Sequence, residues 1–103
     1  MRFSSLFLML ALVPAGASSG DLFSEADIVF LGEQHDNPHH HMRQAEIVAE
    51  LRPTSIVFEM LTVQQAQIVT PDLAADEGTL EAALGWNDSG WPDFSMYYPI
   101  FVA

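Results

Sequence analysis

Two short apolar runs flank a helical pattern in the first half of the chain. The runs 27–31 (DIVFL) and 55–60 (SIVFEM) are rich in β-favouring side chains and predict two buried parallel strands. Between them, Asn37 is a good N-cap, Pro38 suits the first helical position, and apolar residues recur at helical spacing until Pro53. The pattern therefore predicts a β-α-β unit.

Polar residues follow at the ends of both expected strands. A right-handed crossover lays the strands side by side in the same direction, so their carboxyl ends meet at one edge, where open α/β sheets bind ligands. Glu33 and His35 follow the first strand, and Glu59 lies at the end of the second. We expect these three to form a polar rim for a cation or a proton, because a buried carboxylate without a partner is costly.

Other readings of the rim remain open. Glu59 could instead accept hydrogen bonds from the backbone of the next loop, and Glu33 and His35 could cap the following helix. The residues assigned to the turn itself are Gly32, Asn37 and Pro38.

All four histidines lie close together, as His35 and then His39, His40 and His41 in the first turn of the expected helix. The partial positive charge of a helix N-terminus disfavours imidazolium, which keeps these rings in the neutral state that ligates metal or haem iron. Because successive helical residues are about 100° apart, at most one or two of the last three can face one site. The alternative is a polar first turn without ligands.

The second half predicts short helices. Thr62 can cap a helix through Val69, which Thr70-Pro71 ends, and a further helix over 79–84 is closed by Gly85. After a turn-rich loop over 86–91, Pro92 can open a last helical segment, which carries Phe94, Tyr97, Tyr98, Ile100 and Phe101. No third strand is predicted. We therefore expect an α/β fold, in which a β-α-β unit begins a parallel or mixed sheet and short helices follow, as the front part of a larger domain.

The N-terminus has the layout of a secretory signal peptide over residues 1–17. Arg2 is followed by an apolar run at 6–13 and by small residues at 15–17. Eight apolar residues are too few to cross a bilayer core about 30 Å thick, so no stable transmembrane span is expected. The expected mature region is 18–103, exported to the periplasm or beyond in a bacterium; the alternative is an uncleaved membrane-anchoring helix.

The composition limits the partners and the metal-ligating groups that the chain can have. Fourteen Asp and Glu stand against three Arg and Lys combined, for a formal net charge of -11, which disfavours nucleic acid as a partner. The chain has no cysteine, which excludes disulfides, thiolate metal sites and lipid attachment at a lipobox cysteine. The possible ligands are therefore imidazole, carboxylate and phenolate.

Three blocks of the chain resemble a known family. They are residues 27–46 (DIVFLGEQHDNPHHHMRQAE), residues 58–60 with the glutamines that follow, and residues 85–99, which contain Gly-Trp-Pro-Asp. These blocks are similar to the ChaN family of haem-binding proteins, which is implicated in bacterial iron and haem uptake and belongs to a superfamily that includes the Tiki proteases and TraB-type proteins. The resemblance implies an exported haem-binding or metal-associated protein with Gly32, Glu33, His35 and Glu59 on the polar rim.

Three hypotheses follow. In the first, a haem-binding protein rather than an enzyme, iron is ligated by one of five candidates: His39, His40, His41, Tyr97 or Tyr98. In the second, a metal-dependent hydrolase, Glu33, His35 and Glu59 hold Mn, Fe or Zn and activate a water. The third is a truncated, inactive product. Besides haem, the partners considered are a second copy of the chain and a component of a haem-uptake transporter.

Overall fold

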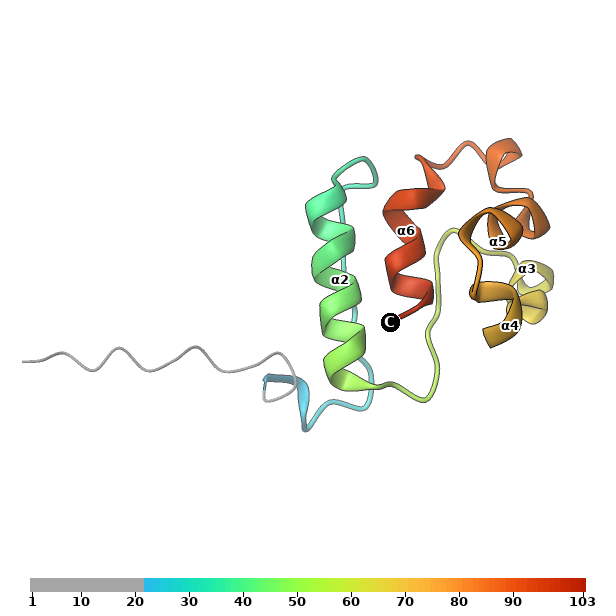
Figure 1. The fold of residues 1–103 in the computed structure, drawn as a ribbon. Helices are drawn as coiled ribbons and strands as arrows, with labels where there is room; N and C mark the ends of the chain where they lie inside the picture. The colour runs from blue at the N-terminus through green and yellow to red at the C-terminus, as the bar shows by residue number, and fades with distance from the viewer. Residues whose placement is uncertain (1–21) are drawn as a thin grey trace, which may run out of the picture.

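The computed structural model describes residues 22–103, so the predicted signal peptide at 1–17 lies outside the described residues. The described part is built from short helices (Figure 1). They are α2 (Pro38–Leu51), α3 (Val63–Ile68), α4 (Pro71–Ala74), α5 (Glu77–Leu84), the 3-10 turn η1 (Trp86–Asp88) and α6 (Phe94–Phe101).

The longest helix within residues 22–103, α2, begins and ends as the sequence predicts. The Asn37 side chain accepts a hydrogen bond from the backbone N–H of His39 at 3.0 Å, and Pro38 occupies the first turn, where its missing N–H costs nothing. At the other end, Arg52 adopts a left-handed conformation with φ of 48° and donates its N–H to the carbonyl of Val48. The predicted N-cap and helix are confirmed.

The shorter helices also carry side-chain caps. Thr62 and Gln65 form a reciprocal capping box at the start of α3, and Gly85 ends α5 in the left-handed conformation, with φ of 60°. Thr70-Pro71 differs from the prediction: it follows α3 and also opens α4, because Thr70 caps that helix and Pro71 fills its first position. The last helix, α6, is capped by Asp93.

The core lies between α5, η1 and α6. Trp86, which is 2% exposed, contacts the rings of Phe94 and Tyr97, each with a centroid 5.0 Å away. Its indole Nε1–H donates to the carbonyl of Pro92 at 2.8 Å, which satisfies the only polar group that the ring buries. The buried cluster consists of Ala74, Leu80, Leu84, Trp86, Phe94 and Tyr97. Helix α6 packs on one side against this cluster and on the other against α2 (Figure 1).

The predicted α/β fold is wrong for this chain. Residues 22–103 contain no strand, and the runs 27–31 and 55–60 remain unpaired, the second turning at its last two residues. The two runs are attached to different helices. The carbonyl of Leu31 accepts a hydrogen bond from Gln44 of α2 at 3.1 Å, whereas Phe58 stacks on Phe101 of α6, with ring centroids 4.4 Å apart.

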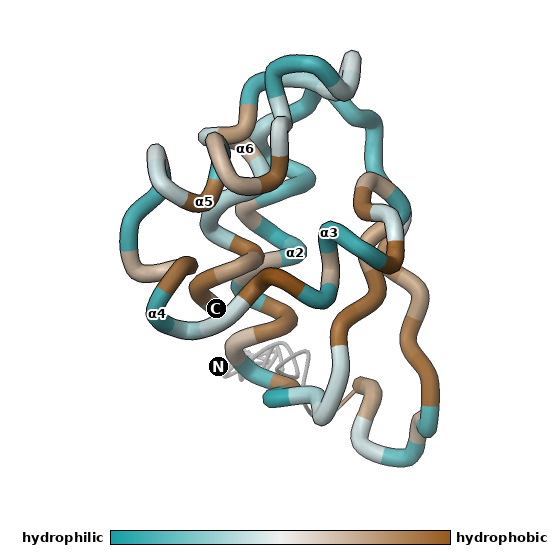
Figure 2. The backbone as a smooth tube through the Cα atoms, turned by 90° about the vertical axis from the view of Figure 1, so that its right-hand side faces the viewer, coloured by the Kyte–Doolittle hydropathy of each residue, from teal (hydrophilic) through white to brown (hydrophobic). Residues whose placement is uncertain are grey.

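These separate attachments explain the missing sheet. Paired strands must lie about 4.8 Å apart, and two strands alone are marginal in water. In Figure 2 the two brown, hydrophobic runs lie along the same side of the molecule as distinct paths, and both line one cleft. The sequence therefore predicts the apolar runs but not their placement, because they do not pair with each other.

Within residues 22–103, no helix combines the length and the apolar character needed to cross a bilayer.

Candidate functional site

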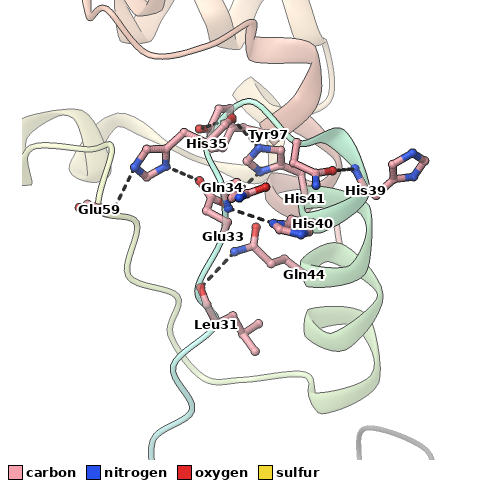
Figure 3. A network of polar contacts seen from close by, with 11 residues as sticks. Leu31, Glu33, Gln34, His35, His39, His40, His41, Gln44, Glu59 and Tyr97 are labelled. Atoms are coloured by element: carbon pink, nitrogen blue, oxygen red, sulfur yellow. Dashed lines mark hydrogen bonds and ion pairs between the residues drawn. The ribbon is translucent and has the colours of Figure 1, made fainter.

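The site is centred on Glu33, at the turn between the first apolar run and α2. Its side chain is only 7% exposed and contacts two imidazoles (Figure 3). Oε1 lies 2.9 Å from Nδ1 of His35, and Oε2 lies 2.9 Å from Nδ1 of His41. Two imidazole partners compensate the carboxylate for the hydration that it loses on burial.

His41 is completely buried and joins Glu33 to the backbone of the turn. Its Nε2 lies 2.9 Å from the carbonyl oxygen of His35, which can only accept, so Nε2 carries a proton and donates it. Its Nδ1 faces Glu33 Oε2 at ion-pair distance, although the angle is not that of a hydrogen bond.

Tyr97, from α6, is also fully buried and reaches the same carbonyl. Its hydroxyl donates to the oxygen of His35 at 3.2 Å, and its ring lies 4.2 Å from that of His41 between centroids. Burial, reinforced by the negative charge of Glu33, raises the pKa of Tyr97 far above its ordinary value. Tyr97 is therefore a protonated donor that fixes the turn, and phenolate is disfavoured.

His35 is the part of this network that reaches the surface. Its side chain is 44% exposed, and its ring meets Trp91 edge-on, with centroids 4.9 Å apart and planes at 78°. The hydrogen bond to Glu33 is the main cause that raises the pKa of His35 above 6.5, and the charges of Glu33, Glu59 and Asp36 act in the same direction. Because Nδ1 donates to Glu33, the neutral ring has its lone pair on Nε2.

Glu59 lies beside His35. Its Oε2 is 4.0 Å from Nε2 of His35, and its side chain is 72% exposed. The expected meeting of Glu59 with the first polar turn is therefore present, although no sheet produces it. Between the two acids stands His35, which contacts both Glu33 and Glu59 (Figure 3).

The other predicted site residues have different surroundings. His39 is exposed and its ring points away from Glu33 in Figure 3, whereas Nδ1 of His40 accepts the backbone N–H of Gln34 at 2.9 Å. The hydroxyl of Tyr98 donates to the carbonyl of Ala74 at 2.9 Å, away from the histidines. Gly32 lines the cleft, and nothing lies within 4 Å of the position that a Cβ would occupy there. Of the three consecutive histidines, His41 alone contacts Glu33, in keeping with their angular separation.

Two features of the site were not assigned from the sequence. Trp91 packs against His35 from a loop 56 positions later, and Gln44 ties α2 to the carbonyl of Leu31. The aromatic loop was visible in the sequence, but nothing in its spacing indicates which imidazole it meets. The residues described by the structure contain no group of three or more His, Asp or Glu side chains placed to hold a metal ion.

Comparison with known protein families identifies the family of this chain. The family model described as "Haem-binding uptake, Tiki superfamily, ChaN" matches residues 21–103, which includes the whole network around Glu33. Neither the comparison with curated proteins nor the comparison with solved structures gave a match. Since the matched region is most of the chain, the protein belongs to the ChaN family of the Tiki superfamily, whose description is haem-binding uptake.

Proposed function

We propose that the chain binds haem and that Nε2 of His35 is the iron ligand. One observation carries this proposal: His35 is a surface imidazole whose other ring nitrogen is held by a buried carboxylate. Ligating histidines in proteins usually donate their second N–H to such a partner, which fixes the tautomer and makes the ligand more basic. When bound, haem would supply an iron atom that an imidazole nitrogen can ligate.

The five ligands suggested by the sequence are less suitable. His41 and Tyr97 are fully buried and hydrogen-bonded to the His35 carbonyl, so iron could reach them only after the turn opened. Tyr98 and His40 already hold backbone groups. His39 is accessible, but no carboxylate among residues 22–103 contacts its ring and orients it.

The surroundings of His35 suit one face of a porphyrin. Trp91, which is half-buried, supplies an aromatic edge beside the imidazole, and Met60 lines the same cleft as His35. An apolar wall with a few well-placed polar groups is the usual composition of a cofactor site. A role in haem uptake and export from the cytoplasm remain predictions that follow from the family and from the N-terminal pattern.

Haemin titration of the purified chain tests the proposal. We expect a shifted Soret band for the native chain, loss of that shift in His35→Ala, and its partial recovery when free imidazole is added to the variant. His39→Ala is the matched control, because its ring is exposed and makes no contact with Glu33, and it should bind haemin like the native chain. An unchanged Soret shift in His35→Ala would reject His35 as the ligand, and no shift in the native chain would reject haem binding.

A further inference from the structure

The two unpaired apolar runs border a large open cleft. It has a volume of about 1240 Å³ and is lined by residues 26–33 and 53–60, together with residues of the helices that include Gln44 and Val48 of α2 and Ile100 of α6. Typical small-molecule pockets measure about 300–1,000 Å³, so this cleft is at or above their upper limit.

The two runs form the walls of the cleft, and the helices hold them apart. The Gln44–Leu31 hydrogen bond fixes the first run to α2, and the stacking of Phe58 on Phe101 fixes the second to α6. No backbone hydrogen bond joins the two runs in the part of the chain that the structure describes. Among the described residues, the only backbone groups of the two runs that form hydrogen bonds are the carbonyls of Leu31 and Phe58. The other N–H and C=O groups of the runs are therefore available to a third extended segment.

Side-chain exposure alternates along the first run as it does along a strand. Ile28 and Phe30 are 75% and 91% exposed, whereas Val29 and Leu31 between them are partly buried. On the opposite wall, Val57 is 93% exposed and Phe58 is partly buried. An occupant of the cleft would thus have apolar neighbours on both of its walls.

The charges at the cleft indicate the ends of the occupant. Asp27 lies at the start of the first run and Glu59 at the far end of the second, whereas no Arg or Lys is among the lining residues. Glu33 also lines the cleft but is already paired with His35 and His41. In a chain with a net charge of -11, the carboxylates of Asp27 and Glu59 favour a partner with positive charge at both ends. An acidic or polar segment would leave both the apolar walls and the carboxylates without complementary contacts.

We propose that this cleft binds an extended apolar peptide segment of a partner protein, flanked by basic residues, through backbone hydrogen bonds to both walls. Main-chain pairing of this kind supplies affinity, and side-chain contacts with Ile28, Phe30 and Val57 supply selectivity. The partner segment would run beside residues 27–31 and 55–58 and end near the acids of the polar rim. The contacts of the segment lie along the runs, whereas the proposed haem ligand is Nε2 of His35, which lines the same cleft. The proposal does not require bound haem.

The test uses the full chain and a fluorescent synthetic peptide, in which five alternating valine and isoleucine residues lie between two terminal lysines. Anisotropy should show saturable binding, and isotope-edited infrared spectra should show the labelled peptide carbonyls shifting to the strand position. A peptide with alternate amides N-methylated keeps the side chains but loses the donors, and it should bind at least about tenfold more weakly. Equal affinity of the two peptides would overturn backbone pairing.

Protein variants locate the binding site. Phe30→Asp and Val57→Asp change strongly exposed side chains on the two walls and should each weaken peptide binding about tenfold or more. Val63→Asp is the control, because Val63 is 69% exposed but lies on α3 and does not line the cleft. Equal affinity in all three variants would overturn the location. Sedimentation showing that the chain fills the cleft with a second copy, which the peptide cannot displace, would also overturn the proposal.

Discussion

Glu33 and His35 stand two positions apart and are joined by a 2.9 Å hydrogen bond from Nδ1 of the imidazole to Oε1 of the carboxylate. The second oxygen of the same carboxylate contacts the buried His41, whose Nε2 in turn holds the carbonyl of His35. The ring and the backbone of His35 are therefore positioned by one connected network. A substitution of Glu33 should therefore alter the position of His35 first.

Glu33→Gln should weaken haem binding about 10–100-fold, the range found when an outer partner of a ligating histidine is lost. The amide is neutral, so it can no longer favour the protonated ring, and the pKa of His35 should fall as well. Haemin titration measures the affinity, and NMR titration of the His35 ring measures the pKa. Glu59→Gln is the matched control: this acid is 72% exposed and 4.0 Å from the ring, so its loss should have a smaller effect on both. Equal losses in the two variants would contradict the special role of Glu33.

Haem binding should weaken as the pH falls through the pKa of His35, because iron and a proton compete for Nε2. Below that pKa, the apparent affinity should decrease about tenfold per pH unit, as expected for one competing proton. Since Glu33 raises the pKa above 6.5, the midpoint should lie above 6.5 in the native chain and move down in Glu33→Gln. Haemin titrations across a pH series check this. A midpoint that is the same in both proteins would show that another group governs the competition.

The stability of the haem-free chain should depend on the same group with the opposite sign. A pKa that is raised on folding means that the folded chain binds the proton more tightly than the unfolded chain. The stabilisation from His35 is therefore complete below pH 6.5 and is lost as the pH rises through the folded pKa. Denaturant unfolding of the native chain and of His35→Ala at a series of pH values should show their difference shrinking as the pH rises over this window. A difference that is constant with pH would argue against the Glu33 hydrogen bond in solution.

Local signals in the sequence predicted α2, α3, α5 and α6, but not α4, which Thr70 and Pro71 open. Asn37, Pro38, Thr62 and Gly85 act within a few residues of their own position, and each caps or ends the helix that it was expected to. Strand pairing is not local, because it requires another backbone edge at a fixed distance, and Leu31 and Phe58 are instead attached to different helices. The α/β prediction failed at this step.

The candidate site was predictable to a similar degree. The sequence predicts that Glu33, His35 and Glu59 lie in one region, and in the structure His35 contacts both acids. The sequence could not indicate which histidine is buried. His39, His40 and His41 are consecutive residues that point in different directions around α2, and only the packing of His41 against Tyr97 shows which one is buried. Burial is also what separates Tyr97 from the accessible ligands.

Tyr97→Phe should lower the free energy of unfolding by about 0.5–1.5 kcal/mol, because it removes one neutral hydrogen bond, the one to the carbonyl of His35, and keeps the packing of the ring. The Soret position of the haem complex should not change, since Tyr97 holds the turn and does not ligate iron. Tyr98→Phe removes a comparable bond to Ala74 and serves as the control for the loss of a hydroxyl. A Soret band altered only in Tyr97→Phe would identify this phenol as a ligand and contradict His35.

Leu80→Ala tests whether these helices form a cooperative unit. Leu80 is fully buried in the cluster that also contains Trp86 and Tyr97, so its truncation should cost about 2–5 kcal/mol through lost burial and the cavity that remains. The matched control is Val63→Ala, a truncation on the exposed face of α3, which should cost less than about 0.5 kcal/mol. Denaturant unfolding followed by both tryptophan fluorescence and circular dichroism is the measurement, and the two signals should coincide in the native chain.

The outcome decides whether the chain is an inactive product without a stable fold. Unfolding curves that coincide for the two signals, and that shift for Leu80→Ala but not for Val63→Ala, would exclude that hypothesis. A native chain that shows no transition would establish that hypothesis and leave the site without a scaffold.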